Sequence, residues 1–211
     1  MYVAIEGVIG VGKTTLARLL QPAFDAEIIL EVFEENPFLS DFYSDRERYA
    51  FQTQIFFLLS RYHQQRRTVM DIVSTGRNVI ADYTFAKDSL FARINIKGDE
   101  LAMYHKVHEA LAEKIQKPDL LVYLQATTDT LMQRIALRDR PYERQMERAY
   151  IHELNLAYDD FFSKPFDHTP VLTIDSNDLN IIQNPEHLKQ VEERIRQSLS
   201  LPPFQQALPL P

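Results

Sequence analysis

The stretch that decides the fold lies near the start of the chain and reads Gly7-Val8-Ile9-Gly10-Val11-Gly12-Lys13-Thr14-Thr15. It fits the pattern G-x-x-x-x-G-K-[ST], between an apolar run typical of a strand and a stretch with helical spacing. In this pattern the glycines let backbone N–H groups turn toward phosphate oxygens, Lys13 reaches the β- and γ-phosphates, and Thr14 can ligate Mg²⁺. A dinucleotide-binding G-x-G-x-x-G does not fit, because Thr15 stands where the third glycine belongs. We therefore predict a phosphate-binding loop over residues 7–15.

Outward from this loop, short β-rich runs alternate with helical stretches, which predicts an α/β fold with a parallel sheet flanked by helices. The expected strands are residues 2–5, 28–32, 78–81, 120–124 and 171–174. Helical spacing of apolar residues covers 16–23, 51–62, 101–115 and 188–199, and we expect Pro202-Pro203 to stop the last helix. The pattern predicts one domain over residues 1–200, followed by a disordered tail over residues 201–211.

Composition excludes several classes of function. The chain has 211 residues, a net charge of −7 and no cysteine, so thiolate catalysis, disulfides and cysteine-type zinc sites are excluded. The negative balance disfavours a nucleic-acid polymer as partner but permits a local anion pocket. The start of the chain lacks a signal-peptide pattern and no apolar run is long enough to span a membrane. We expect a soluble, cytoplasmic protein without a membrane partner.

A phosphate-binding loop is compatible with a switch GTPase, a motor ATPase or a small-molecule kinase. A GTPase would carry Asp-x-x-Gly and Asn-Lys-x-Asp, and neither pattern is in the sequence. ATPase assemblies usually have a strand that ends in paired acidic residues, whereas the apolar run 120–124 is followed by Gln125. The kinase interpretation remains.

Three arginines, Arg134, Arg138 and Arg140, follow a stretch with helical character. The i, i+4 spacing of the first two places their guanidiniums on one helix face. Transfer of a γ-phosphoryl group spreads negative charge over its oxygens, which mobile arginines closing over it would stabilise. The alternative is a solvated cluster that pairs with Glu143 or Glu147. Given the phosphate loop, we predict that the arginines are catalytic and form a lid.

Two acidic residues are expected at the carboxyl edge of the sheet, near the phosphate loop. Asp82 ends one predicted strand and Glu31 ends another. A carboxylate at position 82 can hold Mg²⁺, and one at position 31 can accept the proton of an attacking hydroxyl. Glu34 and Glu35 are rivals for the second role. The alternative for each acid is a helix N-cap or a surface charge.

The predicted helix over residues 51–66 carries Gln54 and Arg61 seven positions apart. This separation is nearly two helical turns, so both side chains share a face. Together they could recognise the planar edge of a base, and the alternative is a polar stripe that faces solvent.

Several motifs in a fixed order extend this pattern along the chain. They are the loop 7–15, Glu31-Val-Phe-Glu-Glu-Asn-Pro37, Tyr43 followed by Phe51-Gln-Thr-Gln54 and Ser60-Arg61, Asp82-Tyr-Thr-Phe-Ala-Lys-Asp88, and Arg134-x-x-x-Arg138-x-Arg140 with Glu143. From residue 2 to about residue 200 the chain resembles the deoxyribonucleoside kinase family, in its bacterial deoxyguanosine and deoxyadenosine kinase branch. The resemblance implies a P-loop kinase fold with a five-stranded parallel sheet and a lid segment, and a homodimer. It also implies Mg²⁺-dependent transfer of the ATP γ-phosphate to the 5′-hydroxyl of a deoxynucleoside.

The resemblance also implies roles for individual residues. Glu31 would be the base at the 5′-hydroxyl, with Thr14 and Asp82 holding Mg²⁺. The other roles follow the motifs: Tyr43 and Glu143 bind the deoxyribose 3′-hydroxyl, Gln54, Arg61 and Asp88 recognise the base, Phe91 stacks on it, and Arg134, Arg138 and Arg140 form the lid.

The chain departs from the family pattern at one point. Many members have Asp/Glu-Arg-Ser where this chain has Asp82-Tyr83-Thr84, so a positive charge expected beside the 5′-hydroxyl is missing, and a lid arginine could supply it. An Asp-Tyr pair here resembles the deoxyguanosine kinase subgroup.

The residues expected to recognise the base favour guanine. Arg61 suits its O6 and N7 acceptors, while Gln54 and Asp88 suit its N1–H and amino group. If Asp88 instead pairs with Arg61, its carboxylate could accept the amine of adenine or cytosine. The remaining alternatives are a nucleoside monophosphate kinase and a nucleotide-binding subunit without catalysis.

Overall fold

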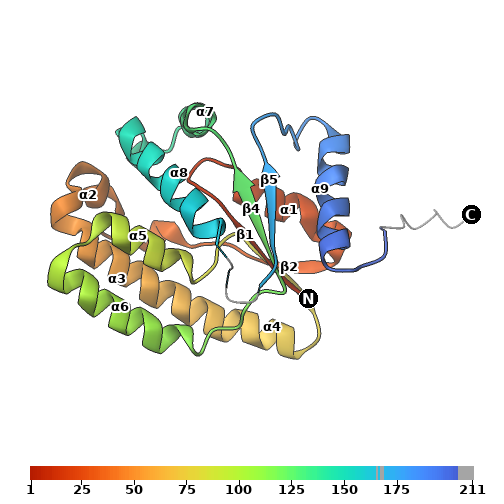
Figure 1. Ribbon diagram of the computed structural model, residues 1–211, viewed down its shortest axis with the longest axis horizontal. Helices are drawn as coiled ribbons and strands as arrows, with labels where there is room; N and C mark the ends of the chain where they lie inside the picture. The colour runs from red at the N-terminus through yellow and green to blue at the C-terminus, as the bar shows by residue number, and fades with distance from the viewer. Residues whose placement is uncertain (165, 167–168, 204–211) are drawn as a thin grey trace, which may run out of the picture.

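The computed structural model describes residues 1–164, 166 and 169–203. In this part of the chain a five-stranded parallel sheet is flanked by helices (Figure 1). The strands are β1 (Tyr2–Glu6), β2 (Ala26–Ile29), β3 (Asn78–Ala81), β4 (Leu120–Gln125) and β5 (Val171–Asp175), in the order β2-β3-β1-β4-β5. The predicted fold class is confirmed.

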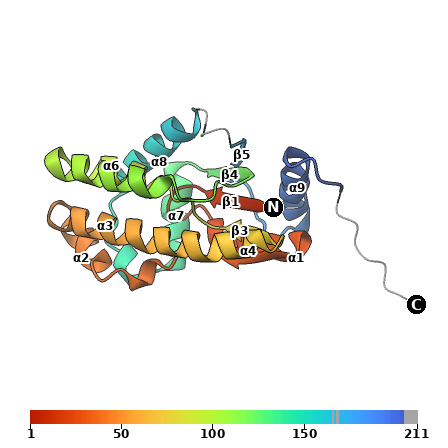
Figure 2. The same ribbon diagram turned by 90° about the horizontal axis from the view of Figure 1, so that it is seen from below.

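The helices are α1 (Lys13–Phe24), α2 (Leu39–Ser44), α3 (Arg46–Gln64), α4 (Met70–Ser74), α5 (Lys87–Asn95), α6 (Gly98–Ala112), α7 (Thr128–Arg138), α8 (Arg148–Phe162) and α9 (Pro185–Ser198). Helix α1 contacts β1, β2, β3 and α9, and α9 contacts β4 and β5, so these two helices cover one face of the sheet. A π-helical turn (Gln65–Val69) joins α3 to α4 in one long rod, and α6 lies along α3 (Figure 2). Short 3₁₀ turns cover Phe33–Glu35 and Pro141–Glu143.

The four helices expected from apolar spacing are present, but the last one ends differently from the expectation. Helix α9 ends at Ser198, before Pro202 and Pro203. Ser200 adopts a left-handed φ of 54°, and the N–H of Leu201 donates to the carbonyl of Arg196 at 2.8 Å. A backbone cap that satisfies the last carbonyls therefore ends the helix. Of the predicted disordered tail, residues 204–211 lie outside the described residues.

Strand β2 lies two to three residues earlier than predicted. Its pairing with β3 runs from Ala26 opposite Asn78 to Ile29 opposite Ala81. The N–H of Asp82 then donates to the carbonyl of Ile29 at 3.1 Å, which closes the ladder. Glu31 consequently follows the strand by two residues and does not end it, because the register with β3 decides where β2 stops.

The centre of the sheet positions the phosphate loop. All five residues of β1 are buried, as expected for a strand covered on both faces. The chain leaves β1 at Glu6, forms the loop and enters α1 at Lys13, so the loop lies at the carboxyl edge of the sheet between β3 and β4. Ligands bind at this edge in open α/β sheets. Across the described residues, no helix has the length and apolar character needed to cross a membrane.

Candidate active site

The phosphate loop has the backbone geometry that its glycines predict. Gly7 has a φ of +149°, and a side-chain Cβ there would lie 2.5 Å from the carbonyl oxygen of Leu124. Gly12 precedes α1 with a φ of +105°, in the region that favours glycine. The ammonium of Lys13 donates to the carbonyl of Gly7 at 2.7 Å and to that of Val8 at 3.3 Å, so it folds back over the loop.

The environment of Lys13 is less favourable to positive charge than water is. Burial, followed by the positive charge of Lys87, lowers the pKa of Lys13 from 10.5 to about 8. A polyphosphate bound in the loop would supply the missing negative charge. Binding of an anion should therefore stabilise the charged form of Lys13.

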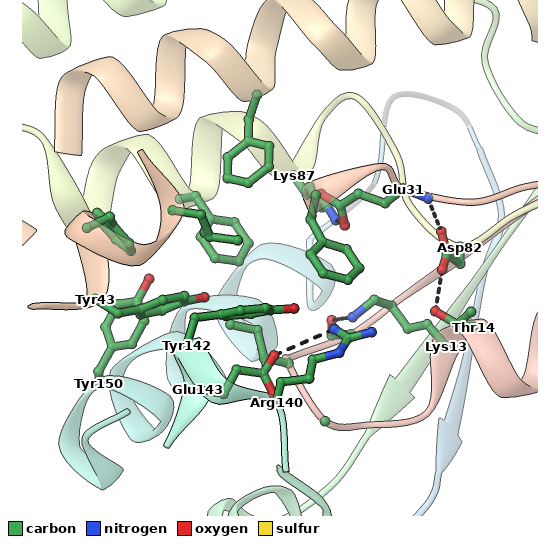
Figure 3. A pocket seen from close by; sticks show the side chains of 18 of the residues that line it. Lys13, Thr14, Glu31, Tyr43, Asp82, Lys87, Arg140, Tyr142, Glu143 and Tyr150 are labelled. Carbon is green, nitrogen blue, oxygen red and sulfur yellow. Dashed lines mark hydrogen bonds and ion pairs between the residues drawn. The ribbon is translucent and has the colours of Figure 1, made fainter. Parts of the chain in front are cut away.

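Thr14 and Asp82 meet beside the loop, as the sequence predicts (Figure 3). The hydroxyl of Thr14 donates to Oδ2 of Asp82, and Oδ1 of Asp82 accepts from the backbone N–H of Glu31 at 2.8 Å. Hydroxyl and carboxylate oxygens are the ligands that Mg²⁺ prefers, with phosphate oxygens and water completing its shell. Within the described ranges no group of three or more His, Cys, Asp or Glu side chains could hold an ion alone. This donor pair fits a magnesium ion that is shared with a nucleotide.

Glu31 lies between two cations. Its Oε1 accepts from Nε of Arg61 at 2.9 Å and also from Nη2 of the same guanidinium, while its Oε2 accepts from Nζ of Lys87 at 2.6 Å. Burial alone would raise the pKa of the Glu31 carboxyl, but Arg61 and Lys87 outweigh burial and hold the pKa well below its ordinary value. The carboxylate is thus ionised throughout the physiological range. The rival Glu35 has an exposed side chain.

The three residues predicted to recognise a base lie on α3 and α5. Nη1 of Arg61 forms an ion pair with Oδ1 of Asp88, whose side chain is fully buried. Gln54 is 2% exposed and lines the same cavity as Arg61, and its Oε1 has no hydrogen-bond partner among the described residues. Arg61 therefore bridges two carboxylates, and the amide of Gln54 is left to meet a ligand.

Aromatic side chains line much of this cavity, which has a volume of about 120 Å³. The rings of Tyr43 and Tyr142 stack with centroids 6.2 Å apart and an interplanar angle of 12°. Burial, with Tyr150 and Glu143 adding to it, raises the pKa of Tyr43 well above 10, so its hydroxyl stays protonated. Phe91 also lines the cavity, and Figure 3 shows Tyr43, Tyr142 and Glu143 along the side away from Asp82.

The three arginines do not form one free cluster. Arg134 and Arg138 lie inside α7, and only Arg140 follows it. Arg134 donates to the carbonyl of Val11 at 3.1 Å and to the carbonyl of Ser176 at 2.5 Å, so it braces the phosphate loop. Two residues on one helix face thus reach different partners, because α7 packs beside the loop.

Arg138 and Arg140 both lie beside the carboxylate of Glu143. Arg138 donates from Nη2 to both carboxylate oxygens of Glu143 at 2.6 and 2.7 Å, and Nη1 of Arg140 lies 3.6 Å from the same carboxylate. The guanidinium of Arg140 also lies over the ring of Phe33, 4.2 Å from its centroid. The alternative pairing with Glu143 that the sequence offered is therefore present.

Comparison with known proteins agrees with this geometry. A protein-family model described as deoxynucleoside kinase matches residues 3–200. The chain belongs to the deoxynucleoside kinase family. A deoxyguanosine kinase of Bacillus subtilis (strain 168) is 33% identical over 199 residues, covering 93% of this chain and 96% of the relative. A deoxyadenosine kinase of Dictyostelium discoideum is also 33% identical, over 195 residues, covering 90% of this chain and 77% of the relative.

Solved structures share the fold of this kinase. The structure of deoxyadenosine kinase from M. mycoides with the products dCMP and a flexible dCDP bound superposes with a TM-score of 0.80 at 24% identity. It covers 93% of this chain and 99% of that chain. The predicted family and branch are confirmed, and the chain is an enzyme that phosphorylates deoxynucleosides.

Sequence reasoning assigned no role to two charged residues of the kinase. Glu6 ends β1 with no exposed surface and accepts from the N–H of Thr84 at 2.6 Å and from its hydroxyl at 3.0 Å, which ties the start of the loop to the segment after β3. Lys87 opens α5 and donates to Glu31, so it places a positive charge in this cavity. The missing arginine at position 83 was the signal that another cation had to be near.

A second and larger cavity, of about 770 Å³, opens on the other side of the loop. It is lined by residues 10–16 of the loop and α1, by Arg134 and Leu137 of α7, and by residues 176–182 after β5. No sequence pattern pointed to residues 176–182, because they are far along the chain from the loop. The two cavities share Gly10, Lys13, Thr14, Arg138 and Arg140 as lining residues.

Proposed function

We propose that this kinase transfers the γ-phosphoryl group of ATP to the 5′-hydroxyl of a purine deoxynucleoside, with deoxyguanosine preferred. The observation that carries the proposal is the position of Glu31, an ionised carboxylate held between Arg61 and Lys87 in the cavity that also contains the phosphate-loop residues Lys13 and Thr14. An acceptor hydroxyl beside Glu31 would face the end of a triphosphate bound by the loop. The larger cavity would hold the rest of the donor.

The residues divide the transfer between them. As the bond from the 5′-oxygen to the γ-phosphorus forms, the bond from that phosphorus to the β-phosphate oxygen breaks, and the hydroxyl proton passes to Glu31. Lys13 and the loop N–H groups hold the departing phosphates, and Thr14 with Asp82 would hold Mg²⁺, which neutralises charge on the phosphate oxygens when bound. Phosphoryl transfer depends mostly on such positioning and charge.

The sugar side of the pocket supports a deoxyribose acceptor. Tyr43 keeps its proton and Glu143 is 5% exposed, so a donor and an acceptor are available to a 3′-hydroxyl. Phe91 would lie against the base. Closure of Arg138 and Arg140 over the phosphates requires that they exchange Glu143 for the nucleotide.

Guanine preference rests on Gln54 and Arg61, which line the cavity, and on Asp88, which pairs with Arg61. The amide of Gln54 offers both a donor and a free acceptor, and guanine presents both at neighbouring positions. Arg61 and Asp88 complete a set that could bind O6 and N1–H. A deoxyguanosine kinase among the relatives at 33% identity supports this choice.

A second substrate, deoxyadenosine, is favoured by one specific contact. The ion pair of Arg61 with Asp88, together with the bonds of Arg61 to Glu31, leaves the guanidinium occupied. In that arrangement Gln54 and Asp88 would accept from the amine of adenine. A relative that is a deoxyadenosine kinase, also 33% identical, supports this alternative.

The test is a mixed-substrate assay with all four deoxynucleosides, ATP and Mg²⁺. Deoxyguanosine should be phosphorylated first, with deoxyadenosine slower by roughly 5- to 150-fold, the effect of about 1–3 kcal/mol for a mismatched polar contact. Deoxyadenosine or deoxycytidine consumed ahead of deoxyguanosine would reject the guanine assignment in favour of an amine bound at Asp88. Transfer to a deoxynucleoside monophosphate in preference to the nucleoside would reject the acceptor class.

The role of Glu31 has its own test. Glu31→Gln should lower kcat by about 10²–10⁴-fold while the nucleoside still binds, because a positioned base contributes this much. Glu35→Gln is the matched control, since Glu35 is exposed close by in the chain. Near-normal turnover of Glu31→Gln would remove Glu31 from the mechanism.

We also propose that the kinase is a Mg²⁺-dependent, cytoplasmic homodimer. Support for a second copy comes from α3 and α6, which lie side by side and expose Leu59 (42%) and Met103 (58%). Apolar side chains on two adjacent helices are typical of a helix-to-helix interface between protomers. Leu59→Glu with Met103→Glu should convert a dimer to a monomer in light scattering, and a wild-type monomer would refute the proposal.

A further inference from the structure

Lys87 is the most enclosed cation in contact with Glu31. Its side chain is 4% exposed, and its ammonium lies 5.6 Å from the ring centroid of Tyr83. Its Nζ donates to Oε2 of Glu31 at 2.6 Å. A buried ammonium is unfavourable unless it is paired, so this position is not a solvated surface lysine.

Lys87 and Arg61 contact Glu31 in different ways. Nη1 of Arg61 forms an ion pair with Asp88, while its Nε and Nη2 donate to Oε1 of Glu31. In the described part of the chain, the ammonium of Lys87 has Glu31 as its only hydrogen-bond partner. Since an ammonium has three N–H donors, two remain available, and Lys87 lines the acceptor cavity.

Lys87 also faces the phosphate side of the cavity. Lys87 and Lys13 both line this cavity. Figure 3 shows Lys87 next to Glu31, with Lys13 across the cavity. The region between two ammoniums attracts a group that becomes negative, and in this reaction that group is the γ-phosphoryl with its attacking oxygen.

We propose that Lys87 is a catalytic residue that donates a hydrogen bond to the acceptor 5′-oxygen and fixes the carboxylate of Glu31 against the same hydroxyl. The inference rests on the proposed role of Glu31 as proton acceptor. The hydroxyl proton still passes to Glu31, and Lys87 keeps its own protons throughout. Lys87 thereby takes the place of a cation at position 83, where this chain has Tyr83.

Arg61 and Lys87 are the two cations bonded to the carboxylate of Glu31. Removing Lys87 leaves Arg61 to hold this carboxylate and takes away the cation expected at the 5′-oxygen, so kcat should fall more than substrate binding.

The experiment compares Lys87→Met, which removes the charge, with Lys87→Arg, which keeps it. Lys87→Met should lower kcat by about 10²–10³-fold, the usual effect of removing one donor to a developing charge, with the KM for ATP changed less than threefold. Lys87→Arg should keep most of the turnover, because it keeps a positive charge beside Glu31. Lys164→Met is the control, because Lys164 pairs with Asp160 on the surface.

A charge-relocation variant separates chemistry from folding. Lys87→Met combined with Tyr83→Arg should recover at least tenfold of the lost kcat, because the ring of Tyr83 lies beside the ammonium of Lys87. Full turnover of Lys87→Met, or lost turnover that neither Lys87→Arg nor the double variant recovers, would overturn the proposal. Should Lys87→Met fail to fold, the same comparison of Lys87→Gln with Lys87→Arg decides it.

Glu31→Gln distinguishes failure of the Lys87 role from failure of the proposed function. If Glu31→Gln is inactive while Lys87→Met is normal, only the role of Lys87 fails. If Glu31→Gln retains turnover, the proposed base fails, and the Lys87 inference fails with it.

Discussion

Replacing Arg61 with methionine should destabilise the kinase more than any exposed ion pair can. The side chain of Arg61 is 7% exposed and that of Asp88 is not exposed at all. Arg61→Met leaves the Asp88 carboxylate buried without an opposite charge, since no other described residue hydrogen-bonds to it. Breaking a buried pair from one side lowers the free energy of unfolding by about 3–5 kcal/mol.

The reverse change should be milder. Asp88→Asn removes one partner of Arg61, but Glu31 continues to bind the same guanidinium. We therefore expect a loss of about 1–3 kcal/mol, the effect of one unsatisfied buried group. The double variant Arg61→Met with Asp88→Asn carries no charge at position 88. Its loss of free energy of unfolding should therefore be smaller than the sum of the two single losses by about 1–3 kcal/mol.

Urea unfolding measures these differences. For a chain of this length the dependence on urea is near the upper end of about 1–3 kcal/mol per molar, so Arg61→Met should lower the midpoint by about 1–1.7 M. Arg77→Met is the matched control, because Arg77 pairs with Glu27 at the surface with both side chains about half exposed. That control should change stability by less than about 1 kcal/mol. Additive effects of Arg61→Met and Asp88→Asn, or a loss below about 1 kcal/mol for Arg61→Met, would refute the ion pair.

Four further predictions follow from the phosphate loop and its surroundings. The pKa of Lys13 is about 8 and a bound triphosphate favours the ammonium, so ATP binding should take up a proton at pH 8–9 and weaken as pH rises above 8. Calorimetry in buffers of different ionisation enthalpy measures this uptake, and proton release would contradict the prediction. Gly7→Ala should abolish ATP binding and destabilise the fold more than Gly76→Ala, since a Cβ at position 7 meets the Leu124 carbonyl at 2.5 Å and one at position 76 meets nothing within 4 Å. Hydrogen exchange over residues 134–143 should slow when a bisubstrate analogue binds, and equal exchange with and without it would refute a lid. Guanosine should be phosphorylated with much lower kcat/KM than deoxyguanosine, and equal values would refute the close packing expected around the sugar.

Local sequence was sufficient for the parts of the site that are contiguous. The phosphate loop works through its own backbone, so nine consecutive residues determine its geometry and its place before α1. The apolar periods of the buried strands predict the parallel sheet, and the topology then brings Thr14 and Asp82 together because both follow adjacent parallel strands. The motif order was sufficient for the family, which the comparison confirms.

The sequence alone did not determine where strand β2 ends. The stretch 28–32 is apolar enough to be a strand, but pairing with β3 from Ala26 to Ile29 moved β2 toward the start of the chain. Register depends on a partner that lies about fifty positions away, so no local pattern fixes it. Glu31 therefore reached the site from the segment after the strand.

The partners of the charged residues were decided only by the tertiary structure. Spacing placed Arg134 and Arg138 on one helix face, yet one binds the loop carbonyl of Val11 and the other binds Glu143. Spacing gave no sign that Lys87 meets Glu31, because the two are 56 positions apart. An ion pair depends on distance and on burial, and both arise only when the sheet edge, α3 and α5 have packed together. The sequence alone thus determined which chemical groups the kinase contains, and the packing determined which of them interact.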